Sequence, residues 1–224
     1  MTTLPWTRMP AEEIETVKSC YDVSWRKYHN WKHPVSMWQR AADLNLAYDE
    51  HLDRAILWHD AIDRVHVHHG MMHPLLSEEF HSATELKIYH QEKKTGLGVN
   101  PSVGLILTTE KPSFLGDARL NTLDLMGIAA AAKHQTFQKA YQDTLALFEE
   151  RKAMDTACNK PKTTWDVFLQ DTHRFLTMTA ARLHRELITV NPPEHPLYLV
   201  QRDIVVGMHS LAQHLMVEIT KTQS

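Results

Sequence analysis

The spacing of apolar and polar residues along this chain predicts a protein built almost entirely of helices. The chain has only 7 Gly in 224 residues, and long stretches lack both Gly and Pro, which favours helices over a sandwich or barrel with many tight turns. Pro10, followed closely by two acidic residues, predicts a first helix that runs to about residue 27. Further helices are expected over residues 34–48, 49–63, 77–94, 103–109, 117–133, 137–152, 165–190 and 197–220.

Clusters of glycine, proline and polar residues mark the breaks between these helices. The clearest are residues 95–101, 111–116, 159–161 and 191–196, and residues 64–74 are expected to form a loop. The apolar run 103–109 fits a strand or a buried helix by periodicity alone, and its helical surroundings favour a helix. We expect one all-α domain over residues 1–224, with its core at about 20–190 and a last helix at about 197–220.

Composition and charge narrow the classes of partner. The net charge is −3 with histidine neutral. The chain therefore has no excess of basic residues of the kind that binds duplex nucleic acid. No run of about 18 apolar residues exists, and no membrane span is expected. The first residues lack the apolar segment of a signal peptide, and Cys20 and Cys158 form no CxxC pattern. A cytoplasmic location is therefore expected.

The adjacent pair His59-Asp60 is the most informative chemical feature of the sequence. It follows an apolar, helix-prone run, where burial of an ionisable group is costly unless the group is paired or binds a metal. His33 lies 26 residues earlier, which is long enough for one helix and a turn to bring it back beside His59. Imidazole and carboxylate ligands suit Mn, Fe, Co, Ni or Zn, and Mg less well. These residues, with a later Asp, have the order of a four-ligand metal site.

The residues around these ligands resemble a known family. Residues 26–33, which include Tyr28-His29-Asn30-Trp31, and residues 55–61 resemble the HD superfamily of metal-dependent phosphohydrolases, and in particular a bacterial branch of predicted HD phosphohydrolases. Weaker matches bring the resemblance to about residues 20–188; they are Ser77–Ala83, Gly104–Thr109, Thr177 and Ala181–Leu187.

The resemblance implies a fold and a set of ligands. The implied fold is an HD-domain helical bundle with additional C-terminal helices. The implied ligands of one divalent metal are His33, His59 and Asp60, completed by an Asp near a glycine. Asp124, in Leu-Asp-Leu-Met-Gly, is the nearest match for that last ligand, and Asp117 is the alternative.

Other residues near these motifs are candidates for contact with substrate. Arg26 fits bidentate binding of a phosphate, or a salt bridge. His29 fits a phosphate contact or a partner that orients a ligand, or a purely structural role. Glu78 and Glu79 are first-turn helix acids, and one of them is also a candidate general base. The expected activity is hydrolysis of a phosphoester or phosphoanhydride in a nucleotide or related small molecule, and a homo-oligomer is left open.

Two departures from the family pattern leave alternatives open. The last Asp motif is imperfect, and Glu110-Lys111-Pro112 stands where the family has a histidine. A catalytically degenerate domain that binds a nucleotide or metal as a regulatory module is therefore the second hypothesis. The third is an iron-dependent oxygenase, in which histidines of the loop would bind a second metal ion. These histidines are His66, His68, His69 and His73.

Overall fold

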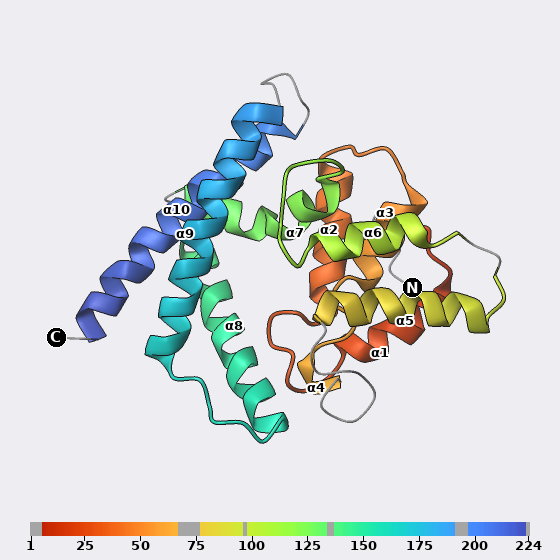
Figure 1. Cartoon of the computed structure of the whole chain (residues 1–224), viewed down its shortest axis with the longest axis horizontal. Helices are drawn as coiled ribbons and strands as arrows, with labels where there is room; N and C mark the ends of the chain where they lie inside the picture. Colours follow the sequence, from red (N-terminus) through yellow and green to blue (C-terminus); the bar gives the residue numbers. More distant parts are fainter. Residues whose placement is uncertain (1–5, 67–76, 96–97, 134–136, 191–196, 223–224) are drawn as a thin grey trace. The chain divides into compact units, whose positions relative to one another are not determined.

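The computed structural model describes residues 6–66, 77–95, 98–133, 137–190 and 197–222, and these residues form helices and no strand (Figure 1). The all-α class expected from the sequence is confirmed. The chain divides into two compact units, Met1–Lys111 and Pro112–Ser224, and each is described by itself. The single domain expected over residues 1–224 stays a prediction. No described helix has the length and apolar character needed to cross a membrane.

The first unit is organised around a short buried helix. Its helices are α1 (Ala11–Tyr21), α2 (Lys32–Asp43), α3 (Glu50–Trp58), α4 (Arg64–His66), α5 (Glu78–Glu92) and α6 (Asn100–Thr108). Helix α3 contacts α1, α2, α5 and α6, and every residue from Leu52 to Trp58 is buried. Asp49 caps its first turn, because the carboxylate accepts from the backbone N–H of His51 at 2.8 Å and of Leu52 at 3.2 Å.

Ion pairs and hydrogen bonds satisfy the polar side chains that α3 buries. The Asp53 carboxylate accepts from the indole N–H of Trp38 at 2.8 Å. The Arg54 guanidinium donates to Glu13 at 3.2 Å, and Glu13 also accepts from the Trp58 indole at 3.0 Å. A buried charge without such partners would be strongly destabilising, so these contacts explain how a helix with charged residues occupies the centre of the unit.

The second unit is built on a long pair of helices. It contains α7 (Arg119–Ala129), the 3-10 turn η2 (Ala130–Ala132), α8 (Phe137–Ala157), α9 (Trp165–Val190) and α10 (Tyr198–Thr222). Helices α9 and α10 run side by side over much of their length (Figure 1). Their buried residues recur at intervals of three, four or seven, as in a heptad seam. They are Leu169, Leu176, Ala180, Leu183 and Leu187 on α9, and Ile204, Met208, Leu211, Leu215 and Ile219 on α10.

A glycine sets the approach of α10 to α7. A Cβ atom at Gly207 would lie 2.2 Å from the carbonyl oxygen of Ile128, a distance that no side chain tolerates. Glycine therefore allows the two helices to pack closely at this point.

Several helix ends differ from those expected. The first helix ends at Tyr21 instead of about residue 27, because the following segment is held by long-range hydrogen bonds. The third ends at Trp58, so that His59 is the C-cap and Asp60 lies beyond the helix. The apolar run around residues 103–109 is confirmed as helical. Of the loop expected over residues 64–74, residues 64–66 form one helical turn, and the remainder lies outside the described residues.

Candidate metal centre

Two packed helices bring the predicted ligands together. His33 lies in the first turn of α2, and His59 and Asp60 follow the last residue of α3. The two imidazoles are buried, with 4% and 1% of the side chain exposed, whereas the Asp60 side chain is 27% exposed. The cluster is therefore enclosed on the imidazole side and reachable from solvent on the carboxylate side.

The donor atoms of the three residues converge. The Nε2 atoms of His33 and His59 are 3.1 Å apart. One Asp60 carboxylate oxygen, Oδ2, lies 3.5 Å from the His33 nitrogen and 3.1 Å from the His59 nitrogen. One ligand atom from each residue lies within 4.8 Å of the others. Ligands about 2.0–2.1 Å from a tetrahedral ion lie about 3.3 Å from one another, so the spacing fits one transition-metal ion.

A backbone contact determines that Nδ1 of the His59 ring carries a proton. Its Nδ1 lies 3.0 Å from the carbonyl oxygen of Ile56. A carbonyl only accepts, so this contact places a proton on Nδ1, and Nε2 is the ring nitrogen that faces Asp60 and His33. Hydrogen bonding of the outer ring nitrogen to a carbonyl is the usual way in which a metal-binding histidine is oriented.

The charge state of Asp60 also suits a metal ligand. Burial raises the pKa of this carboxyl, but the charges of His59 and His29, with a hydrogen bond from His59 and the charge of His33, hold it well below its usual range. Asp60 is therefore a carboxylate. His29 lies beside it, with Nε2 3.8 Å from Oδ2 and 32% of the side chain exposed, on the more open side of the cluster.

A second set of contacts fixes the loop that precedes α2. The Arg26 side chain is only 1% exposed, and its Nε is 3.0 Å from the Asp63 carboxylate. Its other two nitrogens donate to the carbonyl oxygens of His29 at 3.0 Å and Ala61 at 3.1 Å. Arg26 therefore joins the loop to the segment after His59 through a buried ion pair, whereas the alternative to phosphate binding was a salt bridge at the surface. The direct phosphate contact stays a prediction.

Asp63 makes more contacts than the helix cap or active-site role that its place in the sequence suggests. Its carboxylate accepts from the backbone N–H of Val65 at 2.8 Å, from the Trp25 indole at 2.8 Å and from His66 Nδ1 at 2.9 Å. Burial raises the pKa of this carboxyl, but the hydrogen bond from His66 and the charge of Arg26 outweigh it and hold the pKa below its usual range. The position three residues after Asp60 was the one signal in the sequence.

Glu78 and Glu79 begin α5, whose N-cap is Ser77. Burial is the main cause of a raised pKa in both carboxyls, and the negative charge of Asp60 raises both further. The guanidinium of Arg64, with Nε 3.9 Å from Glu78, acts in the opposite direction. Both acids are therefore close enough to Asp60 to interact with it electrostatically.

The predicted fourth ligand belongs to the other unit. Asp124 lies on α7, and its alternative Asp117 pairs with Arg119 at 2.6 Å just before that helix. Because each unit is described by itself, Asp124 as a ligand stays a prediction. Of the loop histidines considered for a second metal, His68, His69 and His73 lie outside the described residues, and His66 is bonded to Asp63.

No known protein family, curated protein or solved structure matches this chain. The class of the candidate site therefore rests on its donor atoms and on the motifs in the sequence.

Proposed function

We propose that this protein is a divalent-metal-dependent phosphohydrolase. The observation that carries the proposal is the convergence of two imidazole nitrogens and one carboxylate oxygen, from His33, His59 and Asp60, within 4.8 Å. This donor set suits Mn, Fe, Co, Ni or Zn better than Mg. The HD-type motifs around the same residues support phosphate-ester chemistry over other uses of such a site.

The three residues would hold the ion, and Asp124 would complete its protein ligands. A bound divalent ion supplies Lewis acidity toward a phosphoryl oxygen and toward water. His33 and His59 exclude solvent from the buried side, and the more exposed Asp60 and His29 leave the opposite side open to a substrate.

Two groups near the cluster would handle charge and protons. Glu78 and Glu79 have a raised pKa, and a carboxylate with a higher pKa is a stronger proton acceptor, so either can serve as general base toward water. The imidazole of His29 can donate a hydrogen bond to a phosphate oxygen. Arg26 acts through the backbone of His29, whose carbonyl it binds at 3.0 Å.

The proposed substrate is a phosphoester or phosphoanhydride of a nucleotide or a related small molecule. The test is phosphate release from a broad panel of phosphorylated metabolites by the full chain, supplied with Mn or Co. We expect release from at least one nucleotide, and loss of release in a His59→Ala/Asp60→Ala variant that keeps its far-UV circular dichroism. His184 is an exposed histidine on α9, and His184→Ala is the matched control that keeps activity. No release from any compound would refute the proposal.

The second candidate function is a regulatory module that binds a nucleotide or metal without turnover. The contacts of Arg26 favour this second function. Its guanidinium is already bound to three protein oxygens, so it would not neutralise the phosphate of a substrate. Tight nucleotide binding by the metal-loaded protein, measured by calorimetry without phosphate release, would select this function.

A further inference from the structure

Helix α9 carries a second regular seam on its solvent side. Its first seam packs in the core of its own unit. The residues of the outer seam also recur at intervals of three and four, and all are exposed; they are Val167, Asp171, Arg174, Met178, Ala181, Arg185 and Ile188. A single helix with two such seams has an unpartnered surface suited to another helix.

Large apolar side chains are exposed along this outer seam. Met178, at its middle, is 68% exposed, and Val167 and Ile188 near its ends are 50% and 73% exposed. Phe175, one turn from Met178, is 45% exposed. Exposed large apolar side chains that recur along one face of a helix are typical of an interaction surface.

Two of the three charged residues in the outer seam, Asp171 and Arg185, lie at equal distances on either side of Met178, and Arg174 is the third. Asp171 lies seven residues before Met178 and Arg185 seven residues after it, about 10.5 Å away on either side along the helix axis. The two charged residues are about 21 Å apart on one helix, and in the part of the chain that the structure describes neither makes an ion pair. A two-fold axis through Met178 would place each carboxylate near the guanidinium of a second, antiparallel copy.

We propose that α9 is a homodimer interface, in which the outer seams of two copies pack antiparallel about Met178. Each dimer then contains the Asp171–Arg185 pair twice, and the apolar ends of one seam lie near those of the other. In an isologous contact the same surface of both copies meets, so that surface must be complementary to itself. The Asp171 and Arg185 pattern meets this requirement, which favours a second copy of the chain over an unrelated partner.

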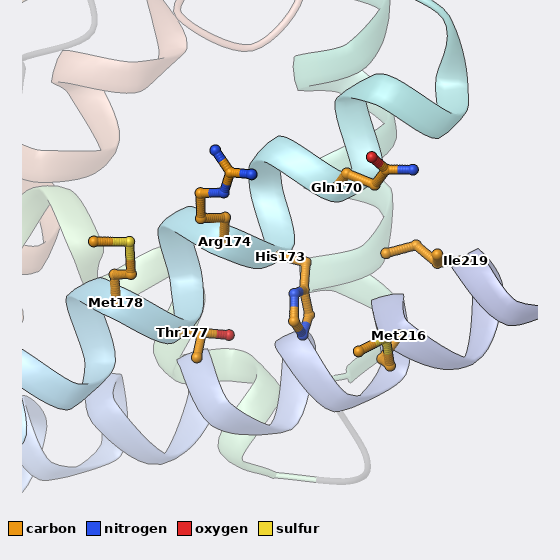
Figure 2. A pocket seen from close by; sticks show the side chains of 7 residues that line it. All are labelled: Gln170, His173, Arg174, Thr177, Met178, Met216 and Ile219. Carbon is orange, nitrogen blue, oxygen red and sulfur yellow. The ribbon is translucent and has the colours of Figure 1, made fainter.

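A groove beside Met178 gives space to the side chains of the second copy. It is about 520 Å³ in volume, and Figure 2 shows that α9 contributes Arg174 and Met178 to it, while α10 contributes Met216 and Ile219. Met216 is itself 48% exposed. An apolar side chain of the partner that enters this groove would be removed from water.

The test is the mass of the full chain in solution over a wide range of concentration, by light scattering coupled to gel filtration. We expect about twice the 25.9 kDa of one chain. Met178→Glu places two like charges at the axis and should give a monomer. The control Val206→Glu changes a side chain on α10 that is 44% exposed, and it should remain dimeric. Both variants should keep wild-type circular dichroism.

Charge reversal identifies the pairing itself. Asp171→Arg creates two like-charge contacts and should raise the dimer Kd roughly tenfold or more. The combined variant Asp171→Arg/Arg185→Asp re-forms both pairs with opposite polarity and should restore the wild-type Kd. A monomeric wild type at all concentrations, a dimer unaffected by Met178→Glu, or failure of the combined variant to recover would each overturn the proposal.

Discussion

Replacement of Arg26 by alanine should destabilise the first unit strongly. The Arg26 and Asp63 side chains are 1% and 7% exposed, and Nε and Oδ2 are 3.0 Å apart. Removal of one partner of a buried ion pair costs about 3–5 kcal/mol, because the remaining charge is left in a poorly solvated site. Asp63 would keep its bonds from Trp25 and His66, so we expect the lower part of this range, about 3 kcal/mol.

Urea unfolding followed by tryptophan fluorescence measures this effect in the relevant unit. Five of the 6 Trp lie in the first unit, and Trp165 belongs to the second. The matched control is Lys93→Ala, which removes an exposed cation that pairs with Glu12 and should cost less than about 1 kcal/mol. If Arg26→Ala costs no more than Lys93→Ala, the buried clamp between Arg26 and Asp63 does not stabilise the loop as inferred.

Three further outcomes follow from other contacts. Asp63 has a pKa held below its usual range, so its contribution to stability is complete above about pH 4 and is lost as the pH falls toward its folded pKa. Asp63→Asn should therefore reduce the acid dependence of urea unfolding, and an unchanged dependence would contradict this. Gly207→Ala should lower the melting temperature measured by circular dichroism, because the added Cβ meets the Ile128 carbonyl at 2.2 Å; an unchanged value would mean that α10 shifts at no cost. Glu13→Ala removes the 3.2 Å partner of Arg54 but leaves its 3.1 Å contact with Glu50, so it should lower the free energy of unfolding by about 3 kcal/mol; a loss under about 1 kcal/mol in urea titration would argue against a buried pair.

The sequence predicts the helical class and much of the site because both depend on local patterns. Periodic apolar residues and capping residues such as Asp49 and Ser77 determine where helices can form. The separation of His33 and His59 by one helix and a turn was enough to predict that they meet, and their Nε2 atoms lie 3.1 Å apart.

The features that could not be predicted depend on contacts between distant residues. Local propensity continues the first helix to residue 27, yet Arg26 is held in a loop by Ala61 and Asp63, 35 and 37 residues away. Glu13 reads as a first-turn helix acid in the sequence. In the structure it is buried and lies 3.2 Å from His90, which is 77 residues later. Asp124, predicted as the fourth ligand, belongs to a different unit from His33, His59 and Asp60, so its role stays a prediction.

Metal content is the most direct measurement of the central claim. Mass spectrometry of the purified protein should find about one transition-metal ion per chain. The His59→Ala/Asp60→Ala variant should lose the ion but keep the circular dichroism of the wild type. The His184→Ala control should retain the ion. No stoichiometric metal in the wild type, even after incubation with Mn, Fe, Co, Ni or Zn, would contradict the assignment of His33, His59 and Asp60 as a metal centre.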